Sequence, residues 1–149
     1  MRRQWLILPF FLSFLFPACG FAQSELVDVQ LPNGTVIHAE LADTPQKRAQ
    51  GLMHREHLAK DHGMLFTFGQ AQLWTFWMKN TKLPLDIIWM SEKKQIIYIA
   101  KSVPICTRQD DGCPQYQPND PALYVLELGS GEADRLKLEK GSKLKFRTP

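Results

Sequence analysis

The fold of this chain is decided in the stretch Leu73–Met90, LWTFWMKNTKLPLDIIWM, where two apolar runs enclose a short polar insert. We expect strands at Leu73–Lys79 and Leu85–Met90, joined by Asn80–Pro84. Both faces of these runs are apolar, which is typical of strands in the middle of a sheet. The polar insert and Asp86 therefore either join two strands or line a site.

On the N-terminal side, the sequence predicts a hairpin followed by a short helix. Glu25–Leu31 and Val36–Leu41 alternate apolar and polar residues. They flank Pro32–Thr35, whose Asn-Gly pair is a strong hairpin-turn signal because it tolerates positive φ. Thr44 then suits a helix N-cap, and Pro45 suits the first helical position, where no N–H is needed.

The rest of the chain has the pattern of short strands separated by turns. A second short helix, capped by Ser130, is expected at Ser130–Leu138, after a long loop at Pro104–Pro121. The other expected strands are Gly63–Phe68, Gln95–Val103, Ala122–Leu128 and Lys143–Phe146. A loop at Gly69–Gln72 is expected after the first of these strands. Many short strands, two short helices and no alternating βα pattern indicate a mainly β fold, an antiparallel β-sandwich or a partly open β-barrel.

Residues 1–22 have the layout of a secretory signal peptide. Two arginines precede an apolar stretch, Trp5–Phe16, that is too short to span a membrane, and small residues precede a cleavage site after Ala22. A lipid anchor on Cys19, after cleavage before it, is the alternative. The remaining residues, 23–149, are expected to form one domain that is periplasmic or secreted.

The composition narrows the function classes. Lys+Arg number 18 and Asp+Glu 15, and removing the two signal-peptide arginines leaves 16 against 15, so no basic patch argues for nucleic acid. An apolar content of 44% supports a packed core. Cys106 and Cys113 lie in a polar loop and predict a local disulfide, which fits export.

Three histidines raise the question of a metal. The segment MHREHLAKDHGM holds His54, His57 and His62 beside Met53 and Met64. Imidazole and thioether groups both suit copper, so a periplasmic copper- or zinc-binding protein is one alternative function. The opposing interpretation places the methionines in the core and the histidines in a solvated connection. We therefore expect neither a metal nor another cofactor.

The candidate binding residues are Trp77, Lys79, Asn80, Thr81 and Asp86. An aromatic face can stack on a sugar ring while amide and carboxylate groups hold its hydroxyls, and a few polar groups in an apolar setting are typical of ligand sites. In the structural alternative, Asn80 and Thr81 cap strand ends, and Asp86 accepts backbone N–H bonds across the turn.

The sequence contains no G-x-S-x-G elbow, P-loop or dinucleotide fingerprint. An enzyme acting on a polar or saccharide-like substrate would use Asp86 as acid or base, with Asn80 positioning the substrate. The leading expectation is instead a non-enzymatic module of the cell envelope that binds a small polar ligand or an envelope protein.

Four segments, spanning about Leu26 to Phe146, resemble the motifs of the domain-of-unknown-function family numbered 192: GLMHREHLAKDHGMLFTF, FWMKNTKLPLDIIWM, VPICTRQDDGCPQY and YVLELGSGEADRLKLEKGSKLKF. The resemblance implies a mainly β fold of the sandwich or half-barrel kind, often behind an export signal, and no established reaction, cofactor or substrate. His54 and His57 do not belong to the family pattern. That pattern falls on Gly51, Leu52, Met53, Gly63, Met64, Leu65, Phe66, Trp77, Met78, Asn80, Thr81, Pro84, Leu85 and Asp86.

Overall fold

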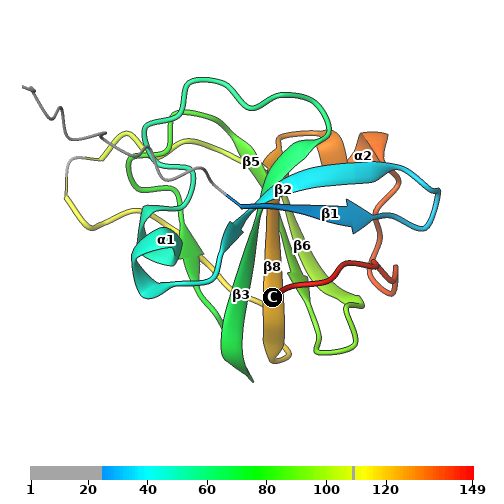
Figure 1. The fold of residues 1–149 in the computed structure, drawn as a ribbon. Coiled ribbons are helices and arrows are strands. Elements are labelled where there is room, and N and C mark those ends of the chain that lie inside the picture. The colour runs from blue at the N-terminus through cyan, green and yellow to red at the C-terminus, as the bar shows by residue number, and fades with distance from the viewer. Residues whose placement is uncertain (1–24, 109) are drawn as a thin grey trace, which may run out of the picture.

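The structure is a computed structural model that describes residues 25–108 and 110–149. Its main element is a six-stranded mixed sheet in the order β1-β2-β3-β8-β5-β6 (Figure 1). The strands of this sheet are β1 (Leu26–Gln30), β2 (Val36–Ala42), β3 (His62–Gln72), β5 (Leu85–Met90), β6 (Ile96–Val103) and β8 (Ala122–Gly129). The expected signal peptide, including Ala22 and Cys19, lies outside the described residues.

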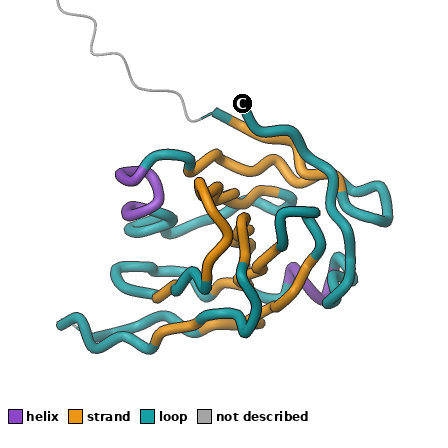
Figure 2. Tube along the Cα trace, turned by 90° about the horizontal axis from the view of Figure 1, so that it is seen from below, coloured by secondary structure: helices purple, strands orange, loops and turns teal. Residues whose placement is uncertain are grey.

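The smaller elements flank this sheet. A two-stranded sheet pairs β4 (Phe76–Trp77) with β7 (Gln115–Tyr116). The two short helices are α1 (Pro45–Gln50) and α2 (Glu132–Arg135), and Figure 2 shows them at opposite sides of the molecule. The large sheet does not close on itself, so the predicted mainly β fold with two short helices is confirmed as an open one.

Local signals explain the first three elements. β1 and β2 pair as the expected antiparallel hairpin, and Gly34 in their turn has φ 86°. In α1, Thr44 Oγ1 accepts a hydrogen bond from the N–H of Lys47 at 3.2 Å, which confirms the predicted cap. The helix carries the chain from β2 to β3, and these two strands run parallel, the one parallel pair among the described strands.

The sheet divides the core into two layers because neighbouring residues of a strand point to opposite faces. All six residues of β5 are buried, which confirms it as an interior strand. On one face, Ile88 and Met90 pack with residues of β1, β2 and α2. On the other, Ile87 and Trp89 pack with residues of β3 and β4.

One expected central strand is wrong. Leu73–Lys79 contributes only Phe76 and Trp77 to the small sheet, and the loop expected at Gly69–Gln72 belongs to β3. The Trp74 ring stacks on Phe68 with 4.0 Å between centroids, and its Nε1–H bonds to the carbonyl of Gln70 at 3.2 Å. The aromatic side chains of this segment therefore fold back over β3 instead of entering the large sheet.

The C-terminal expectations also need correction. The N-cap of α2 is Gly131, with φ 85° and no side-chain cap bond, so Ser130 does not cap this helix. The expected strand at Lys143–Phe146 is present only as isolated bridges, from Gln30 to Lys145 and from Gln95 to Lys143. A single bridge to each neighbour does not build a strand.

Candidate functional site

A pocket of about 440 Å³ opens between α1, β3 and β4. Residues 48–53 of α1 and the following turn line one side, and β8 contributes Glu127. Five aromatic side chains line the pocket: Phe66, Phe68, Trp74, Phe76 and Trp77. The wall is therefore apolar, with few polar groups, as in most small-molecule sites.

Ring contacts hold this wall in place. Phe66 on β3 meets Phe76 on β4 edge to face, with centroids 4.9 Å apart and an interplanar angle of 87°. Phe76 also meets the buried Trp89 of β5 edge to face at 5.7 Å. Such geometries are the preferred ones for aromatic pairs. The small sheet is thus fixed against the large one through its aromatic side chains.

Glu127 is the unusual residue of the pocket. It is 5% exposed and lies on β8 between Met64 of β3 and Ile87 of β5, both apolar. Its Oε2 has no hydrogen-bond partner among the described residues. Burial raises the pKa of this carboxyl to about 8, because the charged form is poorly solvated there. Glu127 therefore holds its proton at neutral pH.

The one cationic side chain that lines the pocket among the described residues forms no hydrogen bond to Glu127 Oε2. Arg48 lines the pocket, but its Nη1 donates to the carbonyls of Asp43 at 2.7 Å and Thr67 at 2.9 Å. Its guanidinium carbon lies 5.3 Å from the centre of the Phe68 ring. These contacts hold the cation against α1 and β3.

Asp86 lies on the opposite face of the sheet from this pocket. Its side chain is 1% exposed, and its cross-strand partner is Leu128, whereas Glu127 faces the other way. Asp86 Oδ1 accepts the N–H of Ser102 at 2.7 Å, and Oδ2 accepts the N–H of Ala133 at 2.8 Å. Asp86 thus joins β5 to β6 and to the start of α2 through backbone N–H groups, and these donors are not the ones across the turn that the structural alternative expected.

The other candidate binding residues divide between the pocket and its outside. Trp77 and Thr81 line the pocket, and Thr81 is 8% exposed. Asn80 is exposed, has φ 55°, and its carbonyl accepts the N–H of His54 at 2.8 Å. Lys79 pairs with Asp111 and lies 5.3 Å from the centre of the Trp77 ring. The two turns that carry the family motifs GLM and NT are therefore hydrogen-bonded to each other.

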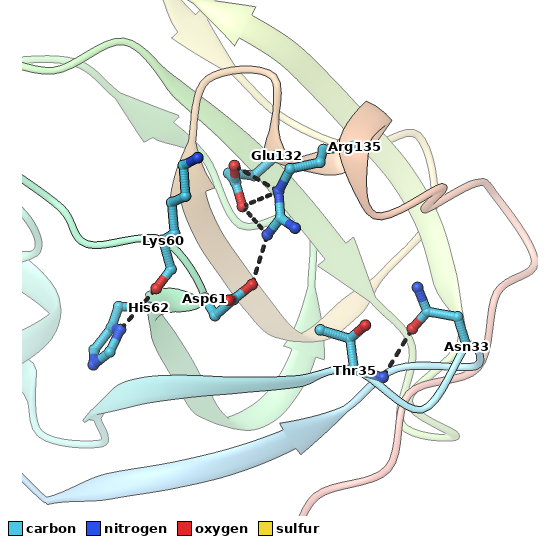
Figure 3. A network of polar contacts seen from close by, with 7 residues as sticks. All are labelled: Asn33, Thr35, Lys60, Asp61, His62, Glu132 and Arg135. Atoms are coloured by element: carbon cyan, nitrogen blue, oxygen red, sulfur yellow. Dashed lines mark hydrogen bonds and ion pairs between the residues drawn. The ribbon is translucent and has the colours of Figure 1, made fainter.

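The three histidines of the segment MHREHLAKDHGM have separate surroundings, and the centre of the His62 ring lies 5.5 Å from that of His38 on β2. His62 Nδ1 contacts the carbonyl of Lys60 at 3.0 Å, as Figure 3 shows, and His57 is exposed. Within residues 25–108 and 110–149, no group of three or more His, Cys, Asp or Glu side chains is placed to hold a metal ion.

A hydrogen-bonded network beside His62 joins the histidine segment to α2. In Figure 3, Arg135 donates from Nη2 to Asp61 Oδ1 at 2.6 Å and from Nε to Glu132 Oε1 at 2.9 Å. The hydrogen bond to Glu132, followed by that to Asp61, raises the pKa of Arg135 further above its usual range. The side chains of Arg135 and Asp61 are nearly half exposed, so the ion pair between them contributes little to stability.

The predicted disulfide is confirmed between Cys106 and Cys113, whose Cα atoms are 5.8 Å apart. The loop that it closes leads directly into β7, and Gln115 and Tyr116 of β7 pair with Trp77 and Phe76 of β4. The disulfide therefore supports the strand that backs the aromatic wall of the pocket.

Fold and pocket together define a small open β domain with a disulfide-supported aromatic pocket. The chain belongs to the DUF192 family, Uncharacterized ACR, COG1430, whose family model matches residues 29–146. This confirms the resemblance seen in the sequence.

Two crystal structures share this fold. One is from Sinorhizobium meliloti 1021, described as a "putative transcription regulator", with 34% identity and TM-score 0.74 over 85% of this chain and 98% of that one. The other is a protein of unknown function from Novosphingobium aromaticivorans DSM 12444, with 34% identity and TM-score 0.72 over 87% of this chain and 89% of that one. No curated protein matches the chain.

Glu127 is the residue that the sequence interpretation missed. The signal was present in the segment YVLELG, where one carboxyl interrupts an apolar run. A buried glutamate is rare unless it is paired, so its position in a predicted interior strand was informative. Its place in the pocket depends on the register of β8 against β3 and β5, which no local pattern specifies.

Proposed function

We propose that this domain is an exported small-molecule-binding module of the cell envelope, and that the aromatic pocket over Glu127 is its site. The observation that carries the proposal is the unpartnered Oε2 of Glu127 in an apolar pocket. Burying a polar group without a partner costs free energy of folding, so a residue kept only for packing would be apolar here. Glu127 lines the pocket, and the fold leaves one of its carboxyl oxygens without a hydrogen-bond partner among the described residues.

The pocket has the size and composition that small ligands need. Its volume of about 440 Å³ falls in the usual range for ligand sites, roughly 300–1,000 Å³. Five aromatic rings around one carboxyl suit a compact molecule with an apolar body and one polar group. This proposal keeps Trp77 and Thr81 of the expected site, and replaces Asp86 with Glu127 as its acidic group.

Export is part of the proposal. A disulfide in a small loop is consistent with an oxidising compartment such as the periplasm. The signal-peptide pattern of residues 1–22 supports the same compartment, with residues 23–149 as the mature domain. Among the described residues, no helix is long and apolar enough to cross a bilayer. The near balance of positive and negative residues offers no support for binding nucleic acid.

The test is to close the pocket from its exposed side. Ala49 lies on α1, is exposed and lines the pocket, so Ala49→Trp fills the entrance without changing the core. Saturation-transfer NMR with indole and benzyl alcohol as probes should show transfer from the wild type and none from Ala49→Trp. Gln46→Trp is the matched control, because Gln46 is exposed on the same helix and does not line the pocket. Equal transfer from Ala49→Trp, or no transfer from the wild type, would overturn the proposal.

A second candidate function is acid–base catalysis by Glu127. The observation that favours it is the raised pKa, because a carboxyl that holds its proton near neutral pH is suited to general acid chemistry. Asp86 is less suited, since backbone N–H groups occupy both of its oxygens. Turnover of p-nitrophenyl glycosides or esters that disappears in Glu127→Gln would favour this candidate; binding without turnover favours the module.

A further inference from the structure

We propose that the pocket takes an organic ammonium ion, an amine with an apolar body, whose N–H groups donate to Glu127 while its body lies among the aromatic rings. This inference rests on the proposed function and names the ligand class for that site. Three features of the pocket support this inference: Glu127 Oε2 has no positively charged partner among the described residues, the neighbouring cations have other partners, and the wall is aromatic.

The first feature is that Glu127 lacks a positive partner. Its neighbours across the sheet, Met64 on β3 and Ile87 on β5, are apolar. The segments β4, 51–53 and Thr81 bring no titratable group to the pocket. Arg48 from α1 is the only other charged residue among the described residues that line it. A buried carboxylate normally has a counter-charge, so here the ligand supplies it.

The second feature is that the neighbouring cations are already engaged. Arg48 donates from Nη1 to two backbone carbonyls and lies over Phe68. Lys79 pairs with Asp111 against the Trp77 ring and does not line the pocket. Both therefore have contacts of their own, and neither forms an ion pair with Glu127 within the described part of the chain.

The third feature is the aromatic wall. Ring faces carry negative electrostatic potential and attract a cation within about 6 Å of the ring centre. No protein cation lies over Phe66 or Phe76 in the described structure, and both line the pocket. An ammonium ion would thus find ring faces and a carboxyl in the same pocket. A carboxylate ligand would lie among aromatic rings and, once Glu127 has lost its proton, would meet a second negative charge.

Binding of an ammonium ion should release the proton of Glu127. The pKa of the carboxyl is raised to about 8, so below that pH the ligand must displace a proton to gain its ion pair. Affinity should then increase with pH by up to about tenfold per unit and level off near pH 8. A neutral alcohol, which can bond to the protonated acid, should show no such increase.

The experiment compares three probes of similar size, namely benzylamine, benzyl alcohol and benzoate, by isothermal titration calorimetry from pH 6 to 8. We expect benzylamine to bind the wild type at least tenfold more tightly than benzyl alcohol at pH 8, and benzoate to bind weakest. Glu127→Gln should lower benzylamine affinity at least tenfold and so remove the preference for benzylamine over benzyl alcohol.

Each outcome separates this inference from the function on which it rests. If benzyl alcohol binds as well as benzylamine, or Glu127→Gln leaves benzylamine unchanged, the ammonium inference is overturned while the pocket remains a binding site. If no probe binds, or Ala49→Trp binds all of them as the wild type does, the proposed function is overturned as well. The unfolding temperature of Glu127→Gln shows whether that variant is folded.

Discussion

Asp86 and Glu127 are two buried carboxyl groups on adjacent interior strands, and they differ in their partners. Asp86 accepts two backbone N–H bonds, from β6 and from α2. Glu127 has an oxygen that no described group contacts. A buried carboxyl is stabilising when the fold supplies its donors and destabilising when it does not. Asp86 therefore holds elements of the fold together, whereas Glu127 lines the pocket.

The largest expected effect comes from removing the satisfied carboxyl. Asp86→Ala leaves the N–H groups of Ser102 and Ala133 buried without an acceptor. The loss of two hydrogen bonds to a charged group should lower the free energy of unfolding by about 4 kcal/mol. For a domain of this size, Tm in thermal unfolding should fall by roughly 10–20 °C.

The matched control for that variant is Asp134→Ala on α2. Asp134 is an exposed carboxylate paired with Lys101, so its loss should leave Tm unchanged. If Asp86→Ala were as stable as Asp134→Ala, the hydrogen bonds of Asp86 would not hold β5, β6 and α2 together. The proposed difference between Asp86 and Glu127 would then be wrong.

Removing the carboxyl of Glu127, whose Oε2 lacks a hydrogen-bond partner among the described residues, should raise the free energy of unfolding instead of lowering it. Glu127→Gln replaces a group that must be kept protonated with a neutral one of the same shape. At pH 8 the variant should be more stable than the wild type by on the order of 4 kcal/mol, measured by urea unfolding. A loss of stability instead would mean that the carboxyl has a partner in solution.

The pH dependence of the wild type sharpens this difference. The pKa of Glu127 is raised from 4.5 to about 8 in the folded state. Between these values the folded protein holds a proton that the unfolded chain releases, so the free energy of unfolding should fall as pH rises and level off above 8. The profile of Glu127→Gln should lack this fall, and the two curves should converge towards pH 5.

The sequence could identify elements with strong local signals. The Asn-Gly turn, the Thr44-Pro45 helix start and the doubly apolar run of β5 were all predicted from neighbouring residues. The aromatic run at Leu73–Lys79 was assigned to the large sheet because its apolar residues indicate burial. Apolar character does not indicate which element covers the residue, so the assignment was wrong. Two of its rings, Trp74 and Phe76, are half-buried against Phe68 and Phe66 of β3.

The site could be predicted only in part, because the local sequence around Asp86 and Glu127 does not specify the register of their strands. In the sequence each is a single carboxyl in an apolar strand, PLDIIWM and YVLELG. Which face each occupies, and whether donors meet it, depends on the register of strands far apart in the chain. Trp77 and Thr81 were found because they lie in or beside the polar insert, whereas the position of Glu127 depends on the pairing of the strands in the sheet.

A smaller effect is expected from the disulfide, and it should be confined to the pocket face. Opening the Cys106–Cys113 loop, in the double variant to serine, should cost about 2 kcal/mol by the chain-entropy relation. Hydrogen exchange should become faster at the amides of β4 and β7, while those of Ser102 and Ala133 on the Asp86 face keep their protection. Uniformly faster exchange across both faces would show that the two regions are not separate.

The smallest expected effect, at Asn80, tests whether the polar insert is a joint or part of the site. Asn80 has φ 55°, and it holds His54 through its carbonyl, which any residue retains. Asn80→Ala should cost about 1 kcal/mol, because alanine tolerates positive φ poorly, whereas Asn80→Gly should cost little. Neither should change the affinity for benzylamine or benzyl alcohol. If Asn80→Gly keeps its Tm but no longer binds benzylamine or benzyl alcohol, the Asn80 side chain is part of the binding site and not only of the connection between the strands.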